Sequence, residues 1–420
     1  MSGSPSRPEA GGLFGWWRAA SPEARRALIA AALGWMLDSF DVMLYSMVLS
    51  ALMPALGMSP STAGQLASLT LIASAAGGLL FGVIADRFGR TRALMASILI
   101  YSIFTAACGL AQNVAQLAVF RLLLGLGMGG EWASGAALVS ETWPAEHRGK
   151  ALGFMQSAWA VGFAAAAVVN ALVLPRWGWR AVFFVGVLPA FFTIWIRRRV
   201  EEPAIWREAR NTHRDARGRF RDIFRGSLAR LTVAVTIMNA FTMFAWWGFN
   251  LWLPGYLSLP PDQGGVGLSV SVMSGMVFVM QIGMWFGYVT FGFVSDAIGR
   301  KRTYVVYLLT AAALILAYTA TTIPLLLLAL GPVVAFFATG YFSGFGAVTA
   351  EIYPTDIRAT AQGFTYNIGR LASAVAPYAV GSLAQTHGFS TALSISAGAF
   401  LLAAATWIWI PETKGRQLAD

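Results

Sequence analysis

The composition of this 420-residue chain excludes an ordinary soluble protein, because 57% of its residues are hydrophobic and only 12% are charged, whereas about 25% are charged in a typical soluble domain. The net charge of +11 does not indicate nucleic-acid binding. All but four of the 30 Lys and Arg fall in tails and loops that we expect on the cytoplasmic side of a membrane, which is the usual orientation signal.

Twelve apolar stretches follow one another along the chain, and each is long enough to cross a bilayer core of about 30 Å as a helix. We expect helices because the strands of a membrane barrel would alternate polar and apolar residues in segments of about ten. The predicted spans are 28–52, 62–85, 93–111, 115–139, 150–173, 180–196, 231–256, 271–295, 303–321, 324–349, 358–384 and 390–410.

The two halves of the chain repeat each other at an offset of 210 residues. GVIADRFGR at 82–90 matches GFVSDAIGR at 292–300, and ETWPAEHRGKALGF at 141–154 matches EIYPTDIRATAQGF at 351–364. Two copies of one helical unit predict an all-α membrane protein with two pseudo-symmetric six-helix bundles, as in many transporters. The predicted divisions are a cytoplasmic N-terminal tail (1–27), an N-terminal bundle (28–196), a basic cytoplasmic linker (197–230), a C-terminal bundle (231–410) and a cytoplasmic C-terminal tail (411–420).

The first span carries two acidic residues, Asp38 and Asp41, near its middle. Their spacing puts both carboxylates on one helical face, and an acidic side chain at this depth costs about 2.5–3.5 kcal/mol. Two ionised carboxylates on one face would repel each other, so the pair can hold a proton, which suggests proton coupling. The alternative is a structural pair that neutralises a basic residue on a neighbouring helix, and the sequence does not separate the roles of the two residues.

The repeated loops place charged residues at the cytoplasmic ends of helices, where such groups interact with helix dipoles and with each other. We expect salt bridges among them that close the cytoplasmic side and break when it opens, or else a role in topology alone. The candidate gate residues are Asp86, Arg87, Arg90, Glu141, Arg148, Asp296, Arg300, Glu351 and Arg358.

The fourth span contains Arg121 and Glu131, ten residues or about 15 Å apart along a helix, so they do not pair with each other. Glu131 is a further candidate for proton binding, and Arg121 is a candidate for proton coupling or substrate binding. Hydrogen bonding between helices is an equally good interpretation of both residues.

The seventh and eleventh spans supply the candidates for substrate binding. Asn250 lies among tryptophans in FAWWGFNLWLP, and Arg370 lies near the middle of the eleventh span, with Asn367 one turn earlier and Tyr366 adjacent to it. A guanidinium forms a planar fork that matches a carboxylate, so Arg370 is the candidate cation and the other three residues are candidate hydrogen-bonding neighbours. The alternative is that Arg370 only neutralises the acidic pair of the first span.

These motifs together resemble the major facilitator superfamily over essentially the whole chain. GVIADRFGRTR resembles its signature between the second and third spans, RLLLGLGMGGE its fourth-span motif, and PETKGR the ending of its sugar and organic-acid carriers. Within the superfamily, LGWMLDSFDVMLYS, GGEWASGAALVSETWP, FAWWGFNLWLP and GFTYNIGRLASAVAP are similar to the sialate/proton symporter group, which includes carriers of lactate and pyruvate. The resemblance implies proton-coupled uptake of a small carboxylate.

The sequence therefore predicts a secondary active transporter, a proton symporter that imports a small organic acid anion such as a monocarboxylate or sialate by alternating access. We expect a monomer in the cell inner membrane with both termini cytoplasmic. Its partners are protons, the carboxylate and lipid, with no nucleic acid, cofactor or metal. The rivals are a proton antiporter that exports drugs or metabolites, although the fifth span lacks the Gly-Pro motif of exporters, and a receptor that does not transport. An enzyme is not expected, because no span assembles a nucleophile, a base and an oxyanion site.

Overall fold

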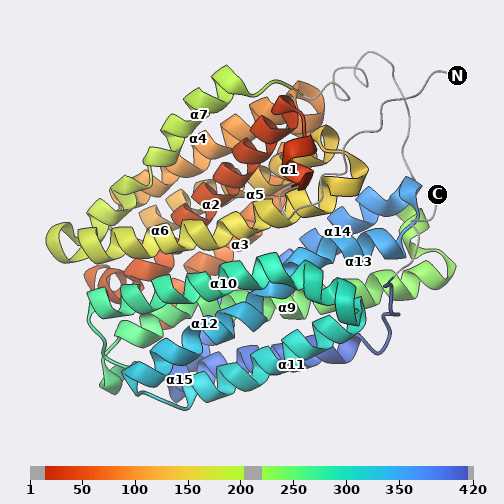
Figure 1. The fold of residues 1–420 in the computed structure, drawn as a ribbon. Coiled ribbons are helices and arrows are strands. Elements are labelled where there is room, and N and C mark those ends of the chain that lie inside the picture. Colours follow the sequence, from red (N-terminus) through yellow and green to blue (C-terminus); the bar gives the residue numbers. More distant parts are fainter. Residues whose placement is uncertain (1–14, 203–219, 415–420) are drawn as a thin grey trace, which may run out of the picture.

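The computed structural model describes residues 15–202 and 220–414, and most of these residues are in α-helices, which form two bundles, one above the other in Figure 1. The N-terminal bundle consists of α2 (Pro22–Ala55), α3 (Pro60–Phe88), α4 (Arg90–Cys108), α5 (Val114–Thr142), α6 (Ala145–Val185) and α7 (Leu188–Arg199), preceded by the short α1 (Gly15–Ala19). The C-terminal bundle consists of η1 (Phe220–Phe224), α9 (Gly226–Ser258), η2 (Pro261–Gln263), α10 (Val270–Ile298), α11 (Arg300–Thr319), α12 (Pro324–Gly340), η3 (Tyr341–Gly344), α13 (Phe345–Ile352), α14 (Thr355–Ser373) and α15 (Ala376–Thr406). The predicted all-α fold of two bundles is confirmed.

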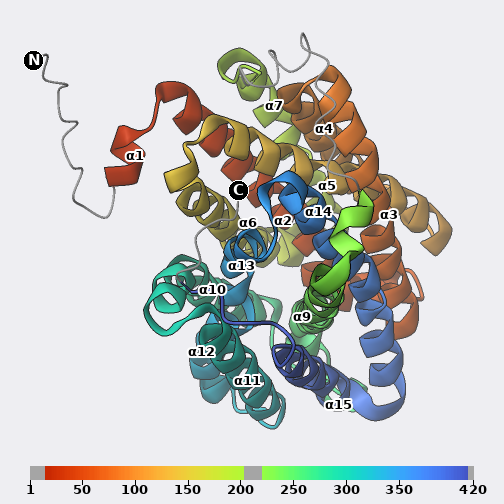
Figure 2. The same ribbon diagram turned by 90° about the vertical axis from the view of Figure 1, so that its right-hand side faces the viewer.

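The two ends of the molecule differ in what they carry. We call the end with α1 and the segment after α15 the tail side; it is the right-hand side of Figure 1 and faces the viewer in Figure 2. The opposite end, where short connections join α2 to α3 and α4 to α5, is called the loop side. Successive long helices run in alternate directions between the two sides.

Within the described ranges, ten helical segments are long and apolar enough to cross a membrane, against twelve predicted spans. Two of them, Gly149–Ile196 and Thr360–Thr406, hold 48 and 47 residues and would be about 70 Å long as straight helices, more than twice the bilayer core. Each breaks at a glycine in the left-handed region, Gly178 (φ 75°) and Gly388 (φ 79°), a conformation that other residues rarely adopt. Each segment therefore crosses twice, which accounts for the twelve spans.

Hydrogen bonds join the two bundles in their loop-side half. The hydroxyl of Ser46 on α2 donates to the carbonyl oxygen of Leu251 on α9 (2.6 Å), and the hydroxyls of Ser61 on α3 and Ser382 on α15 lie 3.0 Å apart. Two further bonds join the backbone N–H of Tyr378 to Ser68 and the amide of Asn170 to Ser274. These bonds therefore hold the two bundles against each other in the loop-side half.

Glycines allow this contact, because the backbones of α3 and α15 almost touch. A Cβ atom at Gly64 would lie 2.4 Å from the carbonyl oxygen of Pro377, and one at Gly381 would lie 2.5 Å from that of Pro60. Small residues at such crossings let helices in a membrane approach closely and gain van der Waals contact.

Candidate functional site

A small cavity lies between the two bundles, near the middle of α2 and α9. Its volume is about 40 Å³, which is room for a few water molecules at most and far below the roughly 300–1,000 Å³ of small-molecule sites. A substrate therefore fits only if the walls move apart. The lining residues are Trp35, Gln156 and Trp159 from the N-terminal bundle and Met243, Trp246, Trp247, Tyr288, Phe342, Tyr366 and Arg370 from the C-terminal bundle.

Four of the ten residues that line the cavity are tryptophans, and they bring α2 and α6 against α9. The ring centre of Trp159 lies 4.7 Å from that of Trp35, 5.6 Å from that of Trp246 and 6.2 Å from that of Trp247, which is the range of interacting aromatic rings. The indole N–H groups of Trp35, Trp159 and Trp246 have no hydrogen-bond partner among the described residues, although all three side chains are buried. A buried donor without an acceptor costs roughly 1–3 kcal/mol, so the closed cavity favours a ligand that supplies acceptors.

Arg370 brings a positive charge to the cavity. It lies in the last turn of α14, where a cation interacts favourably with the C-terminal end of the helix dipole. The residue is only 5% exposed, yet its guanidinium makes no hydrogen bond or ion pair with any described residue. Its N–H donors are thus available for a carboxylate, which a guanidinium binds through two parallel hydrogen bonds.

Two acidic residues of the N-terminal bundle lie within electrostatic reach of Arg370. Asp38 and Glu131 are 1% and 0% exposed, and the guanidinium attracts both carboxyl groups. Glu131 lies directly against α2, because a Cβ atom at Gly34 would be only 2.4 Å from its Oε1. One basic and two acidic groups therefore share a single buried region that spans both bundles.

Asp41 has different neighbours from Asp38, although the two share a face of α2. It lies near Thr105 of α4, whose hydroxyl donates to the carbonyl oxygen of Tyr101 (2.8 Å) rather than to the carboxylate. Neither carboxylate oxygen of Asp41 has a hydrogen-bond partner among the described residues, and none of Asp38, Asp41 and Glu131 lines the cavity. Arg370 acts on Asp38 and Glu131 but not on Asp41. Asp41 is thus a second buried acidic position, outside the group around Arg370.

Arg121 does not reach the cavity. Its Nε donates to the hydroxyl of Thr70 on α3 (2.9 Å), and its guanidinium lies 3.8 Å from the ring centre of Tyr45 on α2. A cation over an aromatic face is attracted by the ring electrons, so Arg121 holds three helices of the N-terminal bundle together.

The other three candidates for substrate binding differ in position. Tyr366 lines the cavity with Arg370. Asn250 does not, because its amide donates to the carbonyl oxygen of Trp246 on the same helix (3.1 Å), and the amide of Asn367 likewise donates to its own helix (2.9 Å). The side chains of consecutive helical residues point about 100° apart, so the side chain of Asn367 points away from the cavity while that of Tyr366 points toward it.

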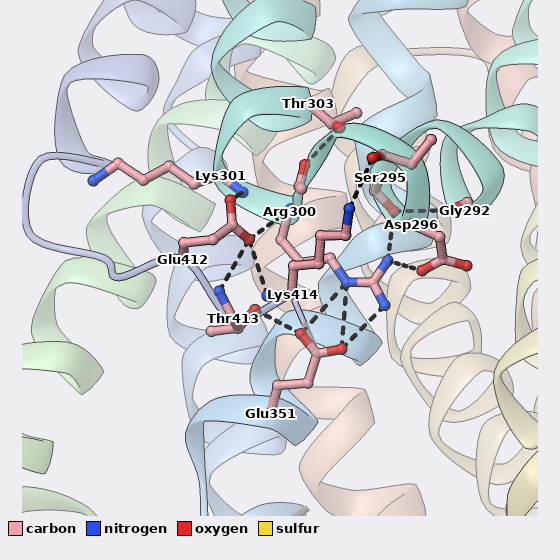
Figure 3. A network of polar contacts seen from close by, with 12 residues as sticks. Gly292, Ser295, Asp296, Arg300, Lys301, Thr303, Glu351, Glu412, Thr413 and Lys414 are labelled. Atoms are coloured by element: carbon pink, nitrogen blue, oxygen red, sulfur yellow. Dashed lines mark hydrogen bonds and ion pairs between the residues drawn. The ribbon is translucent and has the colours of Figure 1, made fainter. Parts of the chain in front are cut away.

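Ion pairs at the tail side repeat in the two bundles. Arg90 of α4 pairs with Glu141 of α5 (2.9 Å), and Arg300 of α11 pairs with Glu351 of α13 (3.0 Å; Figure 3). The predicted salt bridges thus form, but each joins two helices of one bundle. A rocking of one whole bundle against the other leaves these pairs intact, so they brace helix ends.

The remaining gate candidates make local contacts where the structure describes them. Asp296 also pairs with Arg300 (Figure 3), Arg358 donates to the carbonyl oxygens of Ala350 and Tyr353, and Arg87 is exposed. The side chains of Asp86 and Arg148 lie outside the described residues.

Two acidic residues that the sequence did not single out complete these networks. Glu412 accepts hydrogen bonds from the backbone N–H groups of Arg300 (2.8 Å) and Lys301 (3.2 Å) at the start of α11 (Figure 3). Glu202 accepts two in the same way at the start of α4 (3.1 and 3.2 Å). Burial raises the pKa of the Glu412 carboxyl, but the backbone N–H groups that donate to it outweigh this and hold the pKa below its usual value.

Most of the cavity wall carries little sequence signal. Gln156 and Trp159 are the exception, since an amide inside an apolar span, with a tryptophan three residues later, marks one face of a helix. The others, Trp35, Met243, Tyr288 and Phe342, are the residue types of ordinary apolar packing. The described residues contain no group of three His, Cys, Asp or Glu side chains that could hold a metal ion.

Comparison with known proteins agrees with this architecture. The family model of the Major Facilitator Superfamily matches residues 31–262 and 257–420. The chain is 34% identical over 415 residues to a probable 4-methylmuconolactone transporter of Cupriavidus pinatubonensis, covering 96% of this chain and 94% of that one. It is 31% identical over 391 residues to the sialic acid transporter NanX of Escherichia coli, covering 92% and 93%.

A solved structure shows the same fold at lower identity. The crystal structure of a D-xylose-proton symporter aligns with a TM-score of 0.76 at 21% identity, covering 94% of this chain and 100% of that chain. The resemblance inferred from the motifs is therefore confirmed. The chain belongs to the Major Facilitator Superfamily, and it is a multi-pass membrane transporter rather than an enzyme.

Proposed function

We propose that this protein is a proton-coupled symporter that imports a small organic acid anion by alternating access of one central site. The observation that carries the proposal is the free guanidinium of Arg370, which is buried, lines the cavity and has no partner among the described residues. A buried cation of this kind attracts a carboxylate strongly, because little water competes for it. Sialic acid, named for one relative, is itself a carboxylic acid.

Charge balance in the buried region links the anion to a proton. Arg370 attracts Asp38 and Glu131, so one of these two acids, in its ionised form, offsets its charge while the site is empty. A carboxylate that binds the guanidinium neutralises it, so the ionised acidic side chain loses its counter-charge. A buried charge without a partner costs roughly several kcal/mol at this depth. Binding of a proton removes this cost. The anion and the proton therefore move together.

Asp41 and Arg121 have other roles in the proposed mechanism. Asp41 lies three residues further toward the loop side on α2 and outside the reach of Arg370, so we assign it to the proton path and not to the substrate. Arg121 keeps the helices of the proton path together through its contacts with Thr70 and Tyr45.

We assign the tail side to the cytoplasm of a cell whose inner membrane holds the protein as a monomer. The excess of Lys and Arg in the tail-side segments supports this orientation. The inter-bundle hydrogen bonds in the loop-side half then make this conformation closed to the outside. Import requires a second conformation in which those bonds break and the tail side closes.

Uptake of labelled acids into liposomes that contain the purified protein tests the proposal. Acidification outside should drive accumulation, and an ionophore that collapses the pH gradient should abolish it. Arg370→Ala should lose binding, whereas Arg370→Lys keeps the charge, loses the planar fork and should bind at least about tenfold more weakly than wild type. Accumulation that ignores the pH gradient would refute symport, and undiminished acid affinity in Arg370→Ala would refute the role of Arg370.

A further inference from the structure

We propose that the central site selects flat acids that carry a second hydrogen-bond acceptor, and that indole N–H groups of the cavity wall bind this acceptor while Arg370 binds the carboxylate. The proposal rests on the function proposed above, because it concerns the same site. It assigns substrate recognition to three residues, Trp35, Trp159 and Trp246, and it names the class of acid that they fit.

The shape of the wall favours a planar molecule. Indole rings line the cavity from both bundles, and the rings of Trp159 and Trp246, one from each bundle, have centres 5.6 Å apart with their planes at 71°. A flat ring that stacks on the face of one of these indoles meets the other edge-on, and both arrangements are favourable for aromatic pairs. Such a ring needs about 3.5–4.0 Å to each neighbour, so a movement of the bundles by a few ångströms makes room for it. A puckered ring needs a wider opening and gains less contact with flat walls.

The polarity of the wall favours a ligand that is rich in acceptors. The N–H groups of Trp35, Trp159 and Trp246 and the guanidinium of Arg370 are all donors without a partner among the described residues. Against these, the described part of the wall holds one unpaired acceptor, the Oε1 atom of Gln156. A hydroxyl of a sugar acid can accept from an indole N–H, but its own O–H then needs an acceptor, and every further hydroxyl adds another such donor. A flat acid with a ring nitrogen or a carbonyl brings acceptors only.

Buried indoles outside the cavity include both paired and unpaired N–H groups. The buried indoles of Trp143 and Trp252 lie outside it, and they donate to the backbone carbonyl oxygens of Ala24 (2.8 Å) and Pro377 (2.9 Å). Trp407, also outside the cavity, is unpaired and buried in the C-terminal bundle. It therefore supplies a matched control, a buried indole with a free N–H that no ligand of the central site can reach.

Binding of four acids to the full-length protein, measured by calorimetry at pH 7, tests the inference. Benzoate and pyridine-3-carboxylate have the same shape and differ by one ring acceptor; cyclohexanecarboxylate is puckered, and N-acetylneuraminate is rich in hydroxyls. We expect benzoate to bind at least about tenfold more tightly than cyclohexanecarboxylate. Pyridine-3-carboxylate should bind about fivefold more tightly than benzoate, the effect of one neutral hydrogen bond.

Substitution by phenylalanine removes the N–H group and keeps a flat ring. Of Trp35→Phe, Trp159→Phe and Trp246→Phe, at least one should reduce the preference for pyridine-3-carboxylate over benzoate to below about twofold. Benzoate binding in the same variant shows that the protein is folded. Trp407→Phe should leave the preference unchanged.

The possible failures can be told apart. If the puckered acid or N-acetylneuraminate binds as tightly as benzoate, or if none of the three cavity variants changes the preference, then acid selection by the indoles is refuted while acid binding through Arg370 stands. If wild type and Arg370→Ala bind all four acids equally, or neither binds any, the proposed function itself is refuted.

Discussion

On one face of α2, Asp38 lies within electrostatic reach of Arg370, whereas Asp41 lies near Thr105 of α4. Residue types alone do not separate these two carboxylates; the helices that pack against each of them do. In the proposed mechanism, an anion at the guanidinium changes the electrostatic energy of Asp38 and Glu131 directly. Asp41 is then linked to the substrate only through the proton.

Neutral substitutions of the acids should therefore separate binding from proton coupling. Asp38→Asn or Glu131→Gln removes a negative charge that competes for Arg370, so we expect acid affinity to be kept or to rise. Accumulation driven by the pH gradient should fall at least about tenfold, while exchange of labelled for unlabelled acid across the membrane persists. Proteoliposome assays of both modes measure this. Full proton-driven accumulation in both variants would contradict the charge-balance mechanism.

Asp41→Asn is the matched comparison on the same helix. Because Asp41 lies outside the reach of Arg370, acid affinity should stay within about twofold of wild type while accumulation falls. A large loss of affinity in this variant would move Asp41 into the substrate site.

For single residues, the sequence identifies the site residues whose charge is energetically costly to bury in a membrane, and it misses most of the uncharged residues of the site. Asp38, Glu131 and Arg370 stand out because charges are rare in apolar spans. Trp35 does not stand out, because an indole is as common in packing or at a membrane interface as in a binding site. Asn250 has the right chemistry, but the helix rotation that decides its direction depends on packing between bundles.

Among the helices, the contact between α2 and α6 positions one wall of the cavity. A Cβ atom at Gly162 of α6 would lie 1.9 Å from the carbonyl oxygen of Met36, and the hydroxyl of Ser39 on α2 donates to the carbonyl oxygen of Trp159 (2.7 Å). This close approach sets the distance between the indoles of Trp35 and Trp159.

Replacement of Gly162 by alanine should push these helices apart. We expect a loss of about 1–3 kcal/mol in the free energy of unfolding, the usual cost of overpacking, together with weaker acid binding. Gly153→Ala is the control on the same helix. Its Cβ atom meets open space, so the substitution should be neutral or stabilise by up to about 1 kcal/mol. Thermal unfolding of both variants in detergent measures the difference, and equal stability would contradict the close contact.

Apolar runs predict where helices cross, but they do not show where a helix breaks. The predicted span 324–349 divides into α12, η3 and α13, and its break at Tyr341–Gly344 lies against α10, where the hydroxyl of Ser343 donates to the carbonyl oxygen of Tyr288 (2.8 Å). Such a break depends on the neighbouring helix, which a hydropathy pattern does not contain.

For the whole molecule, alternating access requires the loop-side contacts to break. The hydroxyls of Ser61 and Ser382 lie 3.0 Å apart across the two bundles, close enough for cysteines at these positions to form a disulfide. In a protein whose only native cysteine, Cys108, is replaced by serine, Ser61→Cys with Ser382→Cys should stop uptake under oxidising conditions. A reductant should restore it, and either cysteine alone should leave uptake unaffected. Continued uptake by the fully cross-linked protein would show that this side does not open.

At the tail side, the segment 411–414 is held by a titratable group. The lowered pKa of Glu412 means that its ionised form is stabilised by folding, so this stabilisation is present above the ordinary glutamate pKa of about 4.3 and is lost as the pH falls below it. Hydrogen exchange at the N–H groups of Arg300 and Lys301, corrected for intrinsic rates, should therefore speed up below this pH. Glu412→Gln should show little such dependence, and identical pH profiles for the two proteins would contradict the assignment.

The 210-residue repeat predicts the paired bundles and the paired tail-side networks, because both follow from duplication of one unit. It does not predict that Arg90 pairs with Glu141 of the same bundle rather than with a group of the other bundle, since sequence spacing carries no information on which helices become neighbours. The functional groups also depart from the symmetry. Asp38 and Glu131 belong to the N-terminal copy and Arg370 to the C-terminal copy, so the site exists only where the two copies meet.

The hydrogen bonds that serine and asparagine side chains make across the loop side determine how these contacts respond to the salt concentration of the surrounding medium. Each joins uncharged groups, and the screening by dissolved ions that weakens exposed ion pairs acts on charges. In the orientation proposed above, salinity outside the cell should therefore weaken these bonds much less than it would weaken a barrier made of ion pairs.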